Sequence, residues 1–384
     1  MKIIVAYPTL NSTGGAQRVC LHVLKTLQKR EFDVTVATID RTNWSFLEKV
    51  FGESFRPNSE LYMFPRIPTT PTLTLRQALV ALSYAIELFL ITLKGGYDLL
   101  MNMSGEIVDS IGEVIYINAI PLRLMHIYPQ IQPRPNAQWR CYSRLYSFFT
   151  RILRSSNGVV VTNSRFNQSV INKDLGVTAL VVYPPVNIEK IEVTPKNQKR
   201  ANVVVTVSRF RSAKRLEIIP KVAERVKNCD FILIGTVDKD SKECLKQIYL
   251  RGRKLQVQSR IRIFMNKPFR FVSESLSKAK VFLHTQPLEA FGMSVVEAMA
   301  AGCVPVVPKN GGPWFDILDH KQGEYGYSYR SVEEAAEIIE MLVEDDVLRR
   351  EVSARAVRRT MFFNSSVFDK KILGIIEKTL SLKG

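Results

Sequence analysis

Several signatures of common functional classes are missing from this chain of 384 residues. No run of about 18 or more uncharged apolar residues occurs, so no membrane-spanning helix is expected. The five cysteines are scattered, without a CxxC pair or a Cys/His cluster, which argues against a zinc site and a disulfide framework. No Asp-x-Asp pair follows a predicted strand, and the four histidines lack metal-ligand spacing. We therefore expect no metal, no cofactor and a reducing, cytoplasmic location.

Acidic residues are the scarcer charge: 36 Asp and Glu against 54 Lys and Arg give a net charge of +18. The excess is densest between Arg251 and Lys280, where Glu274 is the single acidic residue. Such a balance indicates an anionic partner: a phosphorylated substrate, a nucleic acid or a membrane surface. The alternative is that the basic residues form an ordinary solvated face. A nucleic-acid module is disfavoured because the chain lacks the aromatic and basic strand residues that such modules use.

The length favours two domains of ordinary size. A strand at 2–7, a glycine loop, a helix with its apolar residues on one face, and a strand at 33–39 form a βαβ unit. Further strands are predicted at 99–103, 114–118, 158–163 and 180–182. The pattern predicts a first Rossmann-like domain with a parallel sheet over residues 1–183.

A second α/β domain is predicted over residues 197–365. Its strands are expected at 201–208, 231–235, 262–264, 281–284 and 304–307. Pro184-Pro185 cannot continue a strand ladder, so residues 184–196 are expected to link the domains. Residues 366–384 are expected to form a separate C-terminal helix. The predicted fold is α/β, with two Rossmann-like domains that face a cleft.

The stretch 287–313 is the most informative part of the sequence. Glu289 and Glu297 stand eight positions apart, and Phe291-Gly292 between them opens a predicted helix that ends at Gly302. Amides at the start of this helix, Gly292 to Val295, would point at a phosphate. Glu297 can accept hydrogen bonds from ribose hydroxyls and Glu289 from those of a sugar. The alternative is that both are ordinary solvated carboxylates.

Two other loops follow predicted strands, where α/β sheets bind ligands. Arg209 and Lys214 can reach both phosphates of a nucleoside diphosphate, although ordinary surface charge is the alternative. Gly14-Gly15 lets a ligand approach the backbone at a helix N-terminus, although a tight turn explains the pair equally well.

Two apolar helices are candidates for a surface role. Residues 78–93 are interrupted by Ser83 and Glu87 and are expected to form a buried or interfacial helix. Trp139–Arg154 carries aromatic residues on one side and arginines on the other, which suits a membrane surface. Packing of this helix on its own domain is the favoured alternative.

These motifs resemble the retaining GT-B glycosyltransferases, a family that includes many mannosyl- and glucosyltransferases. The resemblance rests on Glu289-x7-Glu297 with Phe291-Gly292, on Arg209 with Lys214, and on Gly14-Gly15. Three stretches are similar to mannosyltransferases that extend lipid-linked oligosaccharides on the cytosolic face of the membrane: 182–186, 163–166, and Gly311-Gly312-Pro313 followed by Asp316-Ile317.

The resemblance implies a hexosyltransferase that moves a hexose, mannose being favoured, to a glycan or lipid-linked acceptor. It implies a GDP-mannose donor, with a UDP-sugar as the other option, and no metal. The C-terminal domain would bind the donor, the N-terminal domain the acceptor, and the last helix would cross back to the first domain. Arg209, Lys214 and Glu289 would be catalytic. The implied donor contacts are Gly14, Gly15, Asn118, Arg209, Lys214, Glu289, Ala290, Phe291, Gly292, Met293, Ser294, Val295 and Glu297.

One position departs from the family pattern. Asn118 stands where these enzymes usually carry a histidine against the donor sugar, and an amide cannot titrate near neutral pH. His126 replaces that histidine only if its loop folds back. A nucleotide-sugar epimerase of the same build and a catalytically inactive sugar-binding paralogue therefore stay open as alternatives.

Overall fold

The computed structural model describes residues 1–12, 14–52, 54–64, 73–104, 111–120, 123–124, 127–128, 158–192, 199–238 and 240–383. Two compact units make up the chain: unit 1 is Met1–Pro185 with Ser366–Gly384, and unit 2 is Val186–Ser365. The predicted helix Trp139–Arg154, His126 and residues 193–196 of the predicted linker lie outside the described residues.

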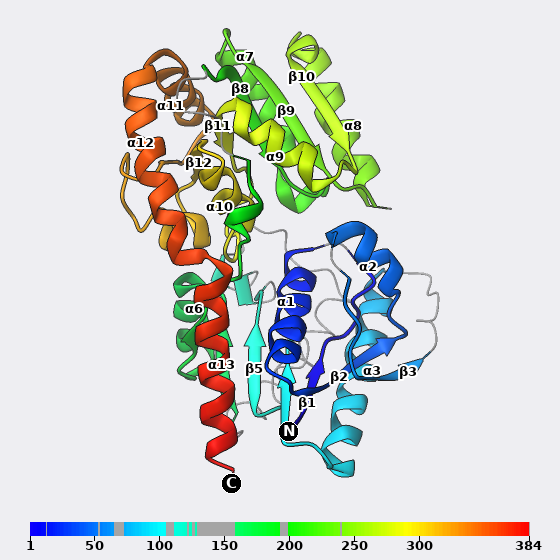
Figure 1. Cartoon of the computed structure of the whole chain (residues 1–384). Helices are drawn as coiled ribbons and strands as arrows, with labels where there is room; N and C mark the ends of the chain where they lie inside the picture. The colour runs from blue at the N-terminus through cyan, green and yellow to red at the C-terminus, as the bar shows by residue number, and fades with distance from the viewer. Residues whose placement is uncertain are drawn as a thin grey trace. The chain divides into compact units, whose positions relative to one another are not determined.

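Unit 1 contains a parallel seven-stranded sheet with helices packed against it (Figure 1). The strands, in sheet order, are β3 (Ser59–Phe64), β2 (Asp33–Asp40), β1 (Lys2–Ala6), β4 (Leu99–Asn102), β5 (Val114–Ile117), β6 (Val159–Thr162) and β7 (Leu180–Val181). Its helices include α1 (Gly15–Lys29), α2 (Trp44–Phe51), α3 (Leu73–Lys94), α6 (Arg165–Leu175) and α13 (Ser365–Ser381).

Unit 2 repeats this architecture with a six-stranded parallel sheet. The strands, in sheet order, are β10 (Ile261–Met265), β9 (Asp230–Gly235), β8 (Ala201–Val207), β11 (Ala279–Leu283), β12 (Val304–Pro308) and β13 (Tyr327–Tyr329). The helices are α7 (Ile219–Arg225), α8 (Ser241–Lys254), α9 (Phe269–Lys278), α10 (Met293–Ala300), α11 (Val332–Glu344) and α12 (Asp346–Arg359).

The predicted fold class is confirmed, since each unit is a Rossmann-like α/β domain. In both sheets the strand order reverses next to the first strand, between β1 and β4 and between β8 and β11. Such switch points leave a crevice at the carboxyl ends of the strands, where α/β domains bind ligands. Sequence analysis missed two edge strands, β3 and β13. β3 is largely exposed and β13 has only three residues, so neither has a continuous apolar run.

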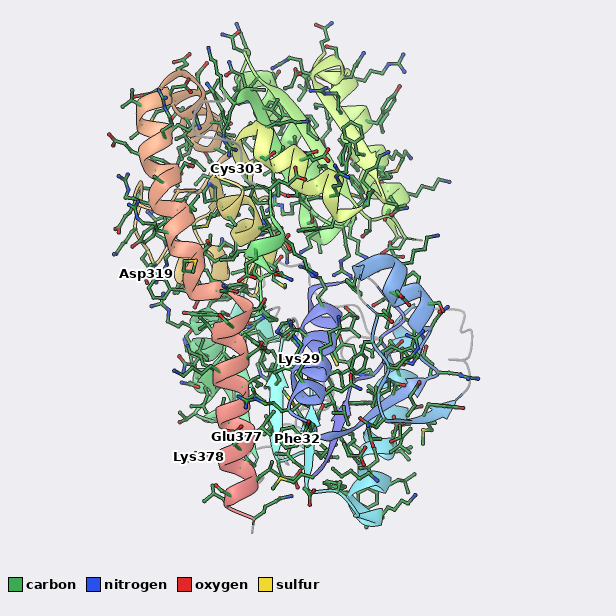
Figure 2. All side chains as sticks on the ribbon, in the orientation of Figure 1. Lys29, Phe32, Cys303, Asp319, Glu377 and Lys378 are labelled. Carbon is green, nitrogen blue, oxygen red and sulfur yellow. The ribbon has the colours of Figure 1, made fainter. Side chains whose placement is uncertain are left out.

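The C-terminal helix packs in unit 1 against the first helix of the chain. The Nε2 atom of His22 on α1 lies 2.7 Å from Oδ1 of Asp369 on α13, and its ring meets Phe368 edge-on at 5.6 Å. Phe368 is buried, whereas Glu377 and Lys378, labelled in Figure 2, are exposed. An apolar face and an ion pair or hydrogen bond thus hold α13 in place.

Glu87 on α3 carries a buried carboxyl group whose Oε2 atom has no hydrogen-bond partner within the part of the chain that the structure describes. Burial raises its pKa to about 8. The carboxyl group therefore contributes stability that is fully present below its ordinary pKa of 4.5 and is lost as the pH rises toward 8.

We accordingly expect Glu87→Gln to remove most of this pH dependence, because the amide cannot ionise. Thermal unfolding followed by circular dichroism should show the variant more stable than the parent at roughly pH 9 and similar to it at roughly pH 5. Glu377→Gln, an exposed position, is the matched control. Equal slopes of melting temperature against pH in the parent and Glu87→Gln would contradict the assignment.

Candidate active site

Three loops of unit 2 converge at the carboxyl edge of its sheet. They follow β8, β11 and β12, which are neighbours in the sheet, with β8 and β11 flanking the switch point. The first loop carries Arg209 and Lys214, the second carries Glu289, and the third contains Gly311-Gly312-Pro313. The motifs that the sequence singled out in unit 2 are therefore brought together by the parallel strand order.

Lys214 and Glu289 form an ion pair across the first two loops. The Nζ atom of Lys214 donates to Oε2 of Glu289 at 2.6 Å, and the two side chains are 20% and 19% exposed. Burial opposes ionisation of Glu289, but the nearby ammonium group and the hydrogen bonds to the carboxylate outweigh it and lower the pKa. The pair therefore presents fixed charges of both signs at the sheet edge.

His284 lies directly after β11 and close to this pair. It is buried, and burial together with the Lys214 charge lowers its pKa to about 4, so the ring is neutral near pH 7. Its Nε2 atom is buried and has no hydrogen-bond partner among the described residues. Its carbonyl accepts a hydrogen bond from the hydroxyl of Tyr329 at 2.8 Å. The Tyr329 hydroxyl thus fixes the backbone where the loop after β11 begins.

Hydrogen bonds join the three loops to one another. The Thr285 hydroxyl donates to the carbonyl of Lys214 at 2.6 Å, and the Leu288 amide donates to Oδ1 of Asn310 at 2.8 Å. The Gly312 amide donates to the carbonyl of Glu289 at 2.7 Å. The ion pair therefore stands on a cross-braced platform, which restricts the positions that its charges can take.

The helix after Glu289 begins at a conformation that requires glycine. Gly292 has a φ of +99°, and a Cβ atom there would lie 3.0 Å from Cγ of Pro313. The Phe291 ring is buried against Phe363, with centroids 5.4 Å apart. The phenyl ring therefore anchors the turn in the core, which leaves its backbone to face the loops.

The predicted phosphate-facing amides are only partly available. α10 begins at Met293, so the helix start is confirmed, but the Val295 amide already donates to the Gly292 carbonyl at 2.9 Å. A tight first turn therefore engages the Val295 amide, and the role of this amide at a phosphate stays a prediction. Glu297 lies one turn further along the helix and is 4% exposed.

The predicted site residues divide between the two units. Gly14, Gly15 and Asn118 belong to unit 1, and all the others belong to unit 2. Gly14 has extended backbone before α1, whose first residue is Gly15. Asn118 follows β5, is 8% exposed, and has a buried Nδ2 atom without a partner among the described residues.

Three residues of the site were missed by the sequence analysis. Thr285 and Asn310 brace the loops, and the Lys309 ammonium lies 5.3 Å from the centroid of the Trp314 ring. Each directly follows β11 or β12 or stands one residue further on. Their position after a predicted strand was a usable signal, but their partners are distant in sequence.

The described residues contain neither a metal-binding cluster nor a membrane-spanning helix. No group of three or more His, Cys, Asp and Glu side chains there could hold a metal ion. Within the same ranges, no helix is long and apolar enough to cross a membrane.

Comparison with known families gives this site a context. The model of the family described as "Glycosyl transferases group 1" matches residues 187–359, which include the loops after β8, β11 and β12. Unit 2 is a glycosyl transferases group 1 domain. The glutamates, the cations and the glycine loop of the candidate site all lie within the matched group 1 range.

Two curated relatives of this chain have the same name, GDP-Man:Man(3)GlcNAc(2)-PP-Dol alpha-1,2-mannosyltransferase. The Neurospora crassa protein is 29% identical over 277 residues, covering 64% of this chain and 49% of that protein. The Caenorhabditis elegans protein is 24% identical over 431 residues, covering 97% and 90%. The chain spans about half the length of the first relatives that it matches.

A solved structure resembles the whole chain. HepE of Anabaena, in complex with UDP and glucose, superposes with a TM-score of 0.72 at 17% sequence identity, covering 98% of this chain and 99% of that one. At this identity the likeness concerns the fold. The chain therefore has the GT-B fold of two Rossmann-like domains, and the group 1 domain is the second of them.

Proposed function

We propose that this protein is a retaining mannosyltransferase that uses GDP-mannose and a lipid-linked oligosaccharide acceptor. The names of the relatives support the donor and the acceptor class. The observation that carries the proposal is the cross-braced Lys214–Glu289 pair at the switch point of the group 1 domain. A UDP-sugar is the second candidate donor, supported by the HepE complex with UDP and glucose.

The catalytic demand falls on the leaving group. When the bond between the sugar C1 atom and the diphosphate oxygen breaks, positive charge develops on the sugar and negative charge on the diphosphate. Fixed cations stabilise the latter, and we assign this role to Arg209 and Lys214. The amides of Gly292, Met293 and Ser294 lie at the start of α10 and are assigned to the same diphosphate.

The carboxylates orient the donor. Glu289, which stays ionised because of Lys214, is assigned to hydroxyl groups of the mannose. Glu297 is assigned to the ribose, while Ala290 and Phe291 shape the backbone between them. Gly14, Gly15 and Asn118 of unit 1 remain proposed donor contacts. The acceptor hydroxyl oxygen then bonds to the sugar C1 atom on the side from which the diphosphate departs, and its proton passes to the departing diphosphate oxygen. The new glycosidic bond therefore keeps the configuration of the donor.

The reaction is proposed to take place at a membrane surface, on its cytoplasmic side. A lipid-linked acceptor is anchored in a bilayer, so the protein has to meet it there. The four described cysteines, Cys20, Cys229, Cys244 and Cys303, are buried and unpaired, which supports a reducing compartment.

A donor and acceptor panel tests the proposal. The purified protein is incubated with GDP-mannose, UDP-glucose or ADP-glucose, with and without a dolichol-linked oligosaccharide. We expect release of GDP from GDP-mannose together with a gain of one hexose on the lipid-linked glycan, followed by mass spectrometry.

Other outcomes of the panel identify the rivals. Release of free sugar that does not depend on the acceptor favours the epimerase-like alternative. Binding of GDP-mannose in calorimetry without any turnover favours an inactive sugar-binding paralogue, which Asn118 keeps open as an alternative. Either result contradicts the transferase assignment.

A further inference from the structure

α3 of unit 1 is apolar on both of its long faces. From Val80 onward, the inward face packs against β1, β2 and β4 through Tyr84, Ala85, Leu88 and Ile91. The outward face carries Leu82, Ile86, Phe89, Leu90 and Leu93, which are 52%, 43%, 55%, 52% and 68% exposed. No other element of the described chain presents more than two exposed large hydrophobic side chains.

The outward face also lacks free polar groups. The Thr92 hydroxyl, the exposed polar group within this stretch, donates to the carbonyl of Phe89 at 2.7 Å. Glu87, the acidic residue of the helix, is turned inward and buried. Exposed Lys94 ends the face. The outward face of α3 between Leu82 and Leu93 is therefore uncharged and bounded by a cation, as suits an interfacial membrane helix.

The patch continues onto the sheet edge. Leu61 on β3 pairs in register with Ala37 of β2, which packs against α3, so Leu61 lies on the same sheet face. Leu61 is 38% exposed. Figure 1 shows α3 beside β2 and β3. Helix and strand together form one surface, which we call the α3 face and define as Leu61, Leu82, Ile86, Phe89, Leu90 and Leu93.

The size of the α3 face favours a bilayer over a second copy of the chain. Half-exposed side chains of this kind present roughly 80 Å² each, which gives on the order of 400–500 Å² in total. A stable protein interface needs about 800 Å² per partner. Leu82 to Leu93 spans about 16 Å along the helix, which is about half the hydrocarbon thickness of a bilayer. The helix can thus lie in the interface without spanning it.

We propose that the α3 face docks unit 1 on the surface of an anionic lipid bilayer. This inference rests on the proposed function, since a lipid-linked acceptor is presented at such a surface. The apolar side chains enter the boundary between headgroups and acyl chains, and Lys94 meets the anionic headgroups, helped by the excess of 23 Lys and Arg over 14 Asp and Glu in unit 1.

Vesicle flotation with matched variants tests the proposal. The vesicles are phosphatidylcholine with roughly one third phosphatidylglycerol, and a second set is phosphatidylcholine alone. The double variant Phe89→Glu/Leu93→Glu is compared with Tyr249→Glu/Leu250→Glu on α8 of unit 2, whose side chains are 62% and 49% exposed. We expect the parent and the α8 variant to float with anionic vesicles and the α3 variant to bind at least tenfold less.

A second measurement tests the proposal even if the α3 variant misfolds. Leu90→Cys, labelled with an environment-sensitive dye, should shift its emission to the blue when anionic vesicles are added. An unchanged spectrum, equal flotation of parent and α3 variant, or no flotation of the parent overturns the proposal. If the parent forms a dimer, does not bind vesicles, and becomes monomeric when the α3 substitutions are introduced, the α3 face is instead an interface between two copies of the chain.

Activity measurements separate this proposal from the proposed function. With GDP-mannose and a short-chain acceptor in detergent, the α3 variant should release GDP at the parental rate, since the group 1 site is untouched. With acceptor embedded in vesicles, its rate should fall at least tenfold. If the parent binds vesicles but does not transfer mannose, the proposed function is wrong and the proposed membrane contact of the α3 face is still supported.

Discussion

Lys214→Ala should lower the rate of sugar transfer by on the order of 10²–10³, and Arg209→Ala should do the same. Both changes remove a fixed positive charge from the place where negative charge develops on the departing diphosphate. Lys214→Ala also leaves Glu289, whose side chain is 19% exposed, without the ammonium that holds its pKa low. Release of GDP from GDP-mannose under saturating donor measures the effect.

Arg211→Ala is the matched control for these two variants. Arg211 stands in the same loop, but its Nε atom donates to Asp238 at 2.7 Å and its side chain is 41% exposed. We expect near-parental turnover, because a partly exposed surface pair contributes little. Unchanged melting temperatures show that the fold is intact. If Lys214→Ala or Arg209→Ala also turned over at the parental rate, the assignment of the diphosphate site would be wrong.

Gly312→Ala should destabilise the candidate site more than any other single-methyl change in it. A Cβ atom at Gly312 would lie 2.3 Å from the carbonyl oxygen of Ala290 and 2.7 Å from Cα of Phe291. Both are backbone atoms, so the two loops must separate and lose the bond from the Gly312 amide to the Glu289 carbonyl. We expect a loss of about 3 kcal/mol in stability and at least tenfold weaker GDP-mannose binding.

Gly252→Ala provides the comparison for this overpacking. Gly252 lies inside α8, where an added Cβ would meet its nearest neighbour, Cδ1 of Ile261, at 3.8 Å. Alanine in a helix interior is favoured over glycine by about 0.5–1 kcal/mol, so the melting temperature should stay equal or rise. Calorimetry gives both the melting temperature and the donor affinity. Parental values of both for Gly312→Ala would show that the loops are not tightly braced.

The two glutamates illustrate how far local sequence reaches. The helix between Phe291 and Gly302 was predictable because its apolar spacing and its terminal glycine are local signals; the Gly302 and Cys303 amides indeed close its end on Met299 and Ala298. The ion pair was not predictable, because Lys214 and Glu289 are 75 residues apart. Their meeting depends on β8 and β11 being neighbours, which no local pattern encodes.

The amide of Val295 and the outward face of α3 show the same limit. Whether an amide is free depends on how tightly the first helical turn closes, which is a matter of geometry rather than residue type. The apolar run at 78–93 predicted a helix that is buried or interfacial, and only packing separates its two faces. The edge strands β3 and β13 were not predicted for a related reason: each is stabilised by pairing with one neighbouring strand, which the local sequence does not show.

The sequence by itself determined the two α/β domains, most strand and helix positions and the residue types of the candidate site, because hydrophobic periodicity and glycine placement act over short range. Only the tertiary structure decided which of those residues meet. The order of strands in the second sheet brings Arg209, Lys214 and Glu289 to one edge, and packing of the first sheet leaves the α3 face uncovered. Contacts between distant segments follow from the topology, which the chain reaches only when its whole core is buried.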